Sequence, residues 1–349
     1  MKTVVFCPNW IGDAVMATPA LRARRKLHPD GRLVGVMKPA IAATLAGNPW
    51  FDDAILCDPK AARREDRGWN VIGRLRREKF DVGILLTNSL RSAMMAFFGG
   101  IRRRVGYARE ARALFLTDRL QPLRRHGRFT PTPIIDYYLA LAYRLGAPPE
   151  SYRMELFVDE TSRRQADDLW RNFGFTAEDR VAVLNPGAAF GPAKKWPLLN
   201  FSELARRLAD DGVKSLVICG PQEREHARFI VDGVGRPRAV KSLADEPVSL
   251  GLSKAIIERA ALLVTTDSGP RHFAPAFGVP VVALFGPTHQ EWTTTYYPLE
   301  TALQKKLPCG PCQQRICPLG HHRCMTELTV NEVYAACRAL LDASARKAA

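Results

Sequence analysis

The chain has 349 residues, which is long for one hydrophobic core and predicts two domains. Hydrophobic residues make up 46% of it and charged residues 25%, as in a globular enzyme, and no apolar run reaches the roughly 18 residues that span a bilayer. Lys and Arg outnumber Asp and Glu by 51 to 35, and the resulting charge of +16 indicates an anionic partner.

The compartment and the type of partner follow from the termini and motifs. Residues 1–10 lead directly into a strand, without the apolar core and cleavage site of a secretion signal, which predicts a cytoplasmic protein. The eight cysteines are then more typical of thiols or metal ligands than of disulfides. The aromatic residues are not arranged among the basic ones as a base-stacking surface requires, so we expect no nucleic-acid partner.

The first half begins with a strand at 3–6, a Gly-containing loop, and a helix over 14–27. Asp13 falls at the N-cap or in the first turn of that helix, at the carboxyl end of the strand. It is either a capping residue or a carboxylate that acts as a general base.

Strands at 33–37, 53–56 and 81–86 follow, separated by helical stretches at 41–46, 69–77 and 92–98. The next stretch is strongly basic and is either a solvated loop region or an anion-binding surface. Its arginines include Arg102, Arg103, Arg104, Arg109, Arg112, Arg119, Arg124, Arg125 and Arg128.

The second half repeats the alternation. Helices are predicted at 160–173, 201–209 and 249–259, and strands at 181–184 and 215–219. Strands that alternate with helices predict an α/β fold with a doubly wound parallel sheet in each half. Neither half contains the G-x-G-x-x-G fingerprint, which argues against a dehydrogenase.

Residues 262–287 have the clearest pattern in the chain. A buried strand over 262–266 precedes the turn Asp267-Ser268-Gly269-Pro270, then a helix ending near 277 with Gly278 as its C′ residue, then a strand over 281–285. The start of that helix is suited to a phosphate, and His272 is near enough to donate to the same ligand. The alternative is an ordinary βα turn with a surface histidine.

Four cysteines in a Pro- and Gly-rich tail form a second unusual feature. Cys309, Cys312, Cys317 and Cys324 surround His321 and His322, and this spacing resembles a structural zinc knuckle. The alternative is a group of packed free thiols. In either case we expect the four cysteines to lie near one another and to brace the tail on the second domain.

Three stretches together resemble a known family. They are N-W-I-G-D through A-T-P-A at 9–20, P-G-A-A-F-G-P-A-K-K-W-P at 186–197, and D-S-G-P-x-H with F-G-P-T at 267–288. In this order they are similar to the ADP-heptose:lipopolysaccharide heptosyltransferases, bacterial glycosyltransferases of GT-B fold. The cysteine tail is similar to that of the heptosyltransferase II branch. The resemblance extends from residue 4 to about residue 341.

The resemblance implies two facing Rossmann-like domains with a cleft between them. The expected boundaries are 1–170 for an acceptor-binding domain, 171–325 for an ADP-heptose-binding domain, and 326–349 for a helix that packs back on the first domain. The implied reaction is inverting transfer of heptose from ADP-L-glycero-D-manno-heptose to a heptosyl-Kdo–lipid A acceptor in lipopolysaccharide inner-core biosynthesis. The resemblance also implies that no cofactor is required, and a structural zinc at the cysteines is the one metal that the sequence suggests.

Site roles carry over residue by residue. Asp13 would take the acceptor proton, and Lys194 would pair with the diphosphate. Ser268 and Gly269 would bind the phosphates, Asp267 and His272 would position the donor, Gly187 would lie beside it, and Glu223 would hold a sugar or ribose hydroxyl. On the acceptor side the expected contacts are Asn9, Trp10, Gly12, Arg104, Arg109 and Arg112.

The expected partners are ADP-heptose and the anionic lipopolysaccharide core, with peripheral contact at the cytoplasmic face of the inner membrane. Three alternatives stay open: a family member with another sugar acceptor, a GT-B nucleotide-sugar epimerase, and a non-catalytic protein that binds anionic surfaces.

Overall fold

The computed structural model describes residues 1–109 and 111–348 and divides the chain into two compact units. Unit 1 comprises Met1–Phe157 and Glu291–Thr295, and unit 2 comprises Val158–Gln290 with the chain from Tyr296 onward. The division falls earlier than the predicted boundary after residue 170. The reason is that α7 (Glu160–Phe173) packs against α10 (Leu250–Glu258) of unit 2.

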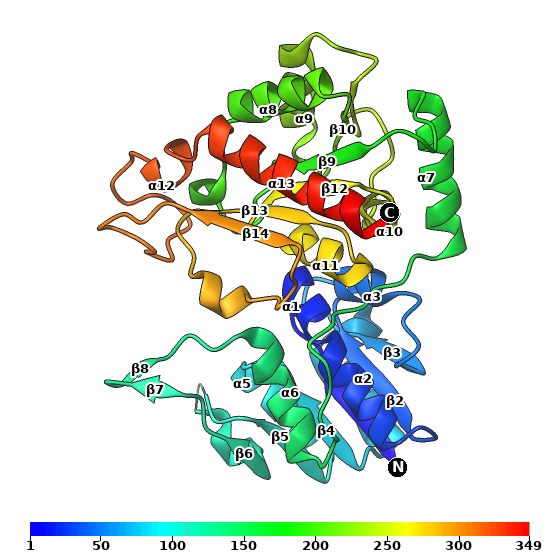
Figure 1. The fold of residues 1–349 in the computed structure, drawn as a ribbon. Helices are drawn as coiled ribbons and strands as arrows, with labels where there is room; N and C mark the ends of the chain where they lie inside the picture. The colour runs from blue at the N-terminus through cyan, green and yellow to red at the C-terminus, as the bar shows by residue number, and fades with distance from the viewer. Residues whose placement is uncertain (110, 349) are drawn as a thin grey trace. The chain divides into compact units, whose positions relative to one another are not determined.

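Unit 1 is built on a six-stranded parallel sheet of order β3-β2-β1-β4-β5-β6 (Figure 1). Its central strands are almost entirely buried, and Val4 in the first strand faces Val34 on one side and Gly83 on the other. Continuous apolar strands of this kind are typical of parallel sheets covered on both faces. The strands are β1 (Lys2–Phe6), β2 (Arg32–Met37), β3 (Asp53–Leu56), β4 (Val82–Leu85), β5 (Arg103–Tyr107) and β6 (Asp118–Leu120).

Two helical layers accompany this sheet. In one, α2 contacts α6, and α1 contacts α3; in the other, α4 contacts α5, and α5 contacts η2. A short antiparallel pair, β7 (Arg124–Arg125) and β8 (Arg128–Phe129), follows the sheet. The helices are α1 (Ile11–Met16), α2 (Thr18–Leu27), α3 (Pro39–Leu45), η1 (Arg64–Asp66), α4 (Gly68–Glu78), α5 (Leu90–Phe98), η2 (Arg112–Phe115) and α6 (Ile134–Arg144).

Unit 2 repeats the topology with a parallel sheet of order β11-β10-β9-β12-β13-β14. The strands are β9 (Val181–Asn185), β10 (Lys214–Val217), β11 (Val240–Ser242), β12 (Leu262–Thr266), β13 (Val281–Phe285) and β14 (Glu300–Gln304). Besides α7 and α10, its helices are η3 (Pro192–Lys194), α8 (Leu198–Asp210), α9 (Arg224–Val234), η4 (Gly269–His272) and α11 (Phe273–Phe277). The short η5 (Gln290–Thr293) begins at the last residue of unit 2 before the chain enters unit 1. The prediction of two doubly wound α/β sheets is confirmed.

The chain ends with α12 (Arg323–Thr326) and α13 (Val330–Ala348). The final helix contacts α8, β12, β13 and β14 and groups with unit 2, and its packing back on the first domain stays a prediction. Within residues 1–109 and 111–348, no helix combines the length and the apolar character that a membrane span requires.

Candidate active site

In each sheet the strand order reverses between two central neighbours, β1 and β4 in unit 1 and β9 and β12 in unit 2. The connections leave those two strands toward opposite sides, so the carboxyl ends of the strands there are open to a ligand. Asp13 follows β1, and the Asp267-Ser268-Gly269 turn follows β12. Both predicted motifs therefore lie at a position where doubly wound sheets bind ligands.

The turn after β12 has nearly the predicted form. Strands β12 and β13 match the expected ranges, and Gly278 ends α11 in the left-handed region with φ of 77°. The helix begins as the 3₁₀ segment η4 from Gly269, preceded by Ser268 in an extended conformation. The first residue of η4, Gly269, has an amide that no intrahelical bond uses, as an anion site requires, whereas Pro270 has no N–H and the Arg271 amide donates to the Ser268 carbonyl at 3.2 Å.

A buried ion pair lies at this turn. The Lys194 ammonium donates to the Asp267 carboxylate at 2.5 Å and to the Asp267 carbonyl at 2.9 Å, and both side chains are less than a tenth exposed. Thr288 Oγ1 donates to the same carboxylate at 2.8 Å. Burial acts to raise the pKa of Asp267, but the charges of Lys194 and Arg271 and the hydrogen bonds outweigh it, so this pKa lies below its usual value. Asp267 therefore holds Lys194 in place.

Arg271 is a member of this cluster that the sequence reasoning missed. It is 2% exposed, donates to Glu300 at 2.6 Å, lies 3.5 Å from Asp267, and its guanidinium stacks 4.6 Å from the Phe285 ring. The sequence did contain an indication of this contact. Arg271 is four residues after Asp267, and side chains at that spacing are neighbours on a helical turn.

His272 lies in the interior of the turn. It is 3% exposed, and within the described residues its Nδ1 atom has no hydrogen-bond partner. Burial, followed by the charge of Arg271, lowers the pKa of His272 to about 3, against the opposing charge of Asp267. The imidazole is therefore neutral at neutral pH, when one ring nitrogen donates and the other accepts.

Asn185 is the last residue of β9, and its side chain connects the carboxyl end of β9 to the carboxyl end of β12. Its side-chain amide donates to Thr265 Oγ1 and Ser268 Oγ, both at 2.9 Å, and its oxygen accepts from the Gly187 amide at 3.4 Å. Asn185 received no role in the sequence analysis, since the predicted strand ends at residue 184. The bond to Ser268 spans 83 residues of sequence, which explains why no local pattern indicated it.

Glu223 and Gly187 are brought together as predicted residues of one site. The Glu223 carboxylate accepts from the backbone amides of Gly220 at 3.1 Å and Ala188 at 3.3 Å. A Cβ atom at Gly187 would lie 2.7 Å from that carboxylate, so a larger residue there would displace the Glu223 side chain. The carboxylate thus connects the loops that follow β9 and β10.

In unit 1, the predicted acceptor residues of the first loop surround the start of α1. Asn9 and Trp10 are exposed and Gly12 is buried, while Asp13 is partly exposed in the first turn, as expected. The N-cap position belongs to Trp10, which makes no side-chain capping bond. Asp13 is therefore not the N-cap of α1, and its charge helps, after burial, to raise the pKa of Tyr138.

Arg109 and Arg112 both follow β5, but they differ in burial and in the groups that they contact. The Arg109 guanidinium lies 4.0 Å from the Phe129 ring, in a partly buried position. Arg112 is fully buried and donates to the carbonyls of Tyr107 and Thr87 and to Asn88 Oδ1. In this structure Arg112 connects the strand ends of β4 and β5, and an acceptor role for it stays a prediction.

Arg104 lies at the other end of β5 from Arg109, and an acceptor role for it stays a prediction. It is the second residue of β5, so it lies toward the amino-terminal end of the strand, whereas Arg109 follows the carboxyl end. Its guanidinium donates to the Phe115 and Ile101 carbonyls and lies 5.3 Å from the Phe97 ring. The basic stretch does not reveal this by its composition, because strand β5 runs between Arg104 and Arg109 and places them at opposite ends of the sheet.

The cysteine tail contains no metal site within the described residues, where no three His, Cys, Asp or Glu side chains converge in a way that could hold an ion. The zinc prediction is therefore not supported. The four thiols are free, and the nearby charges of Cys312, Cys317 and Cys309 add to burial in raising the pKa of Cys324. The tail does brace unit 2. The Arg315 carbonyl accepts from the Ala193 amide at 3.1 Å, and the Gln313 amide donates to Pro287 at 2.8 Å.

Comparisons with known proteins agree with the resemblance in sequence. The family described as "Glycosyltransferase family 9 (heptosyltransferase)" matches residues 69–323. Lipopolysaccharide heptosyltransferase 2 of Escherichia coli K12 is 27% identical over 98% of this chain and 99% of the relative. The protein of the same name from Salmonella typhimurium LT2 is 29% identical over 84% of this chain and 85% of the relative.

Among solved structures, that of E. coli ADP-heptose lps heptosyltransferase II is 26% identical, with a TM-score of 0.79 over 99% of both chains. A glycosyl transferase of family 9 from Veillonella parvula has a TM-score of 0.84 and 24% identity, covering 97% of this chain and 96% of its own. These matches confirm the predicted GT-B class of fold. Since the family match covers well over half of its length, this chain is a glycosyltransferase and belongs to glycosyltransferase family 9, the heptosyltransferase family.

Proposed function

We propose that this protein transfers heptose from ADP-L-glycero-D-manno-heptose to a heptosyl-Kdo–lipid A acceptor, with inversion, in the synthesis of the lipopolysaccharide inner core. The observation that carries the proposal is the buried Lys194–Asp267 pair beside the turn in which Ser268 and Gly269 begin η4, at the switch point of unit 2. The full-length similarity to proteins named lipopolysaccharide heptosyltransferase 2 supports this choice of substrate class.

On the donor side, the ADP diphosphate binds at Lys194 and at the amides of Ser268 and Gly269. Negative charge grows on the diphosphate as the bond to the sugar breaks, so these groups interact most strongly in the transition state. Gly187 and Glu223 lie in the loops that follow β9 and β10. There the Glu223 carboxylate accepts a hydrogen bond from a sugar or ribose hydroxyl. The neutral His272 imidazole and Asp267 position the donor and Lys194. Lysine and the amides supply the positive charge that the leaving group requires, and we propose no cofactor.

On the acceptor side, Asp13 takes the proton of the attacking hydroxyl. That oxygen forms a bond to the anomeric carbon while the bond from this carbon to the diphosphate breaks, and ADP leaves with the electron pair. Asn9, Trp10 and Gly12 surround the carboxylate in sequence. Arg109, and Arg112 if its loop opens, pair with the anionic groups of the acceptor.

Two incubations of the purified protein test the proposal: ADP-heptose alone, and ADP-heptose with an isolated heptosyl-Kdo–lipid A acceptor. A heptosyltransferase of the proposed kind releases ADP and adds one heptose mass to the acceptor in the second incubation only. A change of the donor in the first incubation indicates an epimerase. Release of ADP with other core sugars, but not with this acceptor, indicates a different acceptor. Binding without any product reduces the protein to a binder of anionic surfaces.

A further inference from the structure

Asn88 is a polar residue at the open end of unit 1 that the proposed chemistry does not use. It lies three residues beyond β4, the strand beside β1 at the switch point of unit 1. Asp13 follows β1, so both residues lie at the carboxyl end of the sheet, where doubly wound folds bind ligands. Asn88 is also partly exposed, so a ligand can reach it.

Two long-range hydrogen bonds fix the side-chain oxygen of Asn88. Arg112 Nη2 donates to Asn88 Oδ1 at 3.2 Å, and the Tyr137 hydroxyl donates to the same atom at 2.9 Å. A guanidinium can only donate, so the atom that faces Arg112 must be the amide oxygen and not the amide nitrogen. The identity of its partner therefore settles which way the amide is turned.

Both partners of Asn88 are themselves held in place. Arg112 is fully buried and also donates to the carbonyls of Tyr107 and Thr87. The Tyr137 ring stacks on the Tyr107 ring, with the two centroids 3.5 Å apart. Burial raises the pKa of Tyr137 against the charges of the arginines beside it, so the hydroxyl keeps the proton that it donates. The Asn88 amide is therefore oriented before any ligand binds.

The amide nitrogen of Asn88 takes no part in this network. Within residues 1–109 and 111–348, Nδ2 donates to no protein group, and it is open to solvent. Its two N–H donors are therefore left for a ligand, while the oxygen is already occupied. The charges of Arg109 and Arg112 both act on the neighbouring Tyr137 hydroxyl, so the surroundings of the amide favour an anion.

We infer that the Asn88 amide binds a carboxylate of the acceptor, with Nδ2 donating to an oxygen of the acidic sugar. The inference rests on the proposed function, because it takes this acidic sugar, Kdo, from the proposed acceptor. A carboxylate only accepts hydrogen bonds, which suits an amide with two unused donors. Arg112, as it lies here, is then a positioning residue: it holds Asn88 instead of touching the acceptor, which accounts for its burial.

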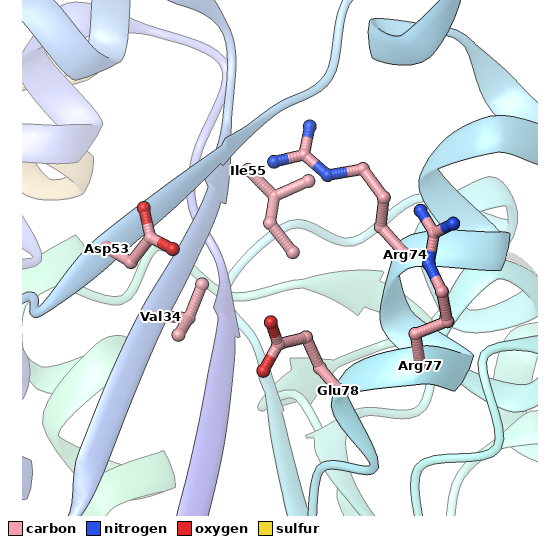
Figure 2. A pocket seen from close by; sticks show the side chains of 6 residues that line it. All are labelled: Val34, Asp53, Ile55, Arg74, Arg77 and Glu78. Carbon is pink, nitrogen blue, oxygen red and sulfur yellow. The ribbon is translucent and has the colours of Figure 1, made fainter.

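The cavity that Figure 2 shows lies elsewhere on unit 1. It has a volume of about 130 Å³, and Arg77 and Glu78 of α4 line it across from Val34 and Asp53 on the strands. Val34 and Asp53 are register partners near the starts of β2 and β3. The cavity therefore lies toward the amino-terminal end of the sheet, opposite the end at which Asn88 lies. Arg77 thus supplies a control site within the same unit.

The variant Asn88→Asp tests the inference. An Asp oxygen still accepts from Arg112 and Tyr137, so the internal bonds are kept, but a negative oxygen replaces the donors that face the ligand. We expect the thermal midpoint and the KM for ADP-heptose to stay close to wild type. The KM for the heptosyl-Kdo–lipid A acceptor should rise about tenfold or more, because like charges then face each other. A purely structural role for Asn88 would leave this KM unchanged.

A second acceptor identifies the group that Asn88 binds. In it, the carboxyl groups of Kdo are converted to methyl esters. We expect the wild type to have a KM about tenfold higher for the ester, because the ester carries no charge for the site to bind. On the ester, Asn88→Asp should perform like the wild type, since the repulsion is removed as well. A variant impaired by the same factor on both acceptors would assign the amide to a hydroxyl and overturn the inference.

Two control variants accompany the test. Asn331→Asp makes the same change in unit 2, at an asparagine whose Oδ1 also accepts from a guanidinium, that of Arg207, at 2.5 Å. Arg77→Gln changes the net charge of unit 1 by the same amount, at the cavity in Figure 2. Each control should alter the acceptor KM by less than about twofold, because single distant charges are screened.

Tyr137→Phe is the second variant, and it keeps the test sharp if Asn88→Asp does not fold. It removes one of the two donors that orient the amide, so it should raise the KM severalfold for the free acid and not for the ester. An acceptor KM that stays at the wild-type value in both variants, or that rises equally in the controls, would overturn the inference while wild-type transfer still supports the proposed function. A wild type that transfers to neither acceptor would overturn both.

Discussion

Asp13 lies in the first turn of α1 but does not cap it, since Trp10 holds the N-cap position without a side-chain bond. The carboxylate therefore does not occupy the N-cap position, and the general-base hypothesis for it stays a prediction. We expect Asp13→Asn to lower transfer by about two to four orders of magnitude, because Asn cannot accept the proton. The thermal midpoint and the affinity for ADP-heptose, measured by scanning and titration calorimetry, should stay close to wild type. Near-normal turnover in this variant would remove Asp13 from the chemistry.

Lys194 combines a structural role with the proposed catalytic one. Lys194→Ala leaves the buried Asp267 carboxylate with Thr288 at 2.8 Å and Arg271 at 3.5 Å. We expect a loss of about 3 kcal/mol of unfolding free energy, as when one partner of a buried pair is removed. Turnover per folded molecule should fall by roughly two orders of magnitude, since a preorganised positive charge is lost.

Lys195 is the control for this prediction, because it is the adjacent lysine but lies partly exposed. Lys195→Ala should change neither the urea midpoint nor the turnover to a comparable extent. Equal impairment of the two variants would mean that the role assigned to Lys194 belongs to the loop as a whole.

His272 should make the stability of unit 2 depend on pH. Its pKa of about 3 in the folded protein is below that of an unfolded histidine, so between the two values only the unfolded state binds the proton. This contribution is complete above about pH 6.5 and is lost as the pH falls toward 3. Between pH 7 and pH 5 we expect the wild type to lose about 2 kcal/mol that His272→Gln does not lose, measured by urea unfolding. Parallel losses in both proteins would contradict the burial of a neutral imidazole.

At the scale of elements, the tail and η3 depend on one close approach. A Cβ atom at Gly191 would overlap the Arg315 carbonyl oxygen, the acceptor for the Ala193 amide. We expect Gly191→Ala to lower the unfolding free energy by about 1–3 kcal/mol, as overpacking does. Hydrogen exchange at the Ala193 amide should become faster at the same time, because the tail no longer covers it.

Gly73 provides the opposite case on α4. A Cβ atom added at Gly73 would have no other atom within 4 Å, and Gly73 is inside a helix. Gly73→Ala should therefore stabilise the protein by up to about 1 kcal/mol. We expect Gly191→Ala to lower the thermal midpoint and Gly73→Ala to raise it. A shift in the same direction for both variants would mean that the contact with the Arg315 carbonyl oxygen does not explain the effect at Gly191.

For the whole molecule, charge is unevenly distributed between the units. Residues 1–157 contain 27 Lys or Arg and 14 Asp or Glu, so this part carries +13 of the total charge of +16. The cations at the donor site are instead buried in pairs. Salt screens exposed charges more than buried ones. We expect the KM for the anionic acceptor to rise severalfold between low and high salt, while the KM for ADP-heptose changes much less. Equal salt dependence of both constants would contradict this separation.

The repeating order of elements and the position of the principal motifs could be predicted from the sequence alone. Strands β12 and β13, the Gly278 cap and the first-turn position of Asp13 depend on residues within a few positions of one another. Such features follow from backbone preference and hydrophobic period, which are local properties. Family motifs in the correct order then indicated heptosyl transfer without knowledge of any contact.

The surroundings of each charged side chain, by contrast, depend on how distant segments pack together. Lys194 and Asp267 are 73 residues apart in sequence yet form one buried pair, and Arg112, which was predicted to contact the acceptor, is fully buried. Arg104 faces the layer of α5 and η2, because its place in β5 sets the end of the sheet at which it lies. The cysteines could be counted in the sequence, but their failure to converge on an ion depends on how the tail packs. Charge, burial and partner distance are properties of packed surfaces, and distant segments form those surfaces only when the chain folds.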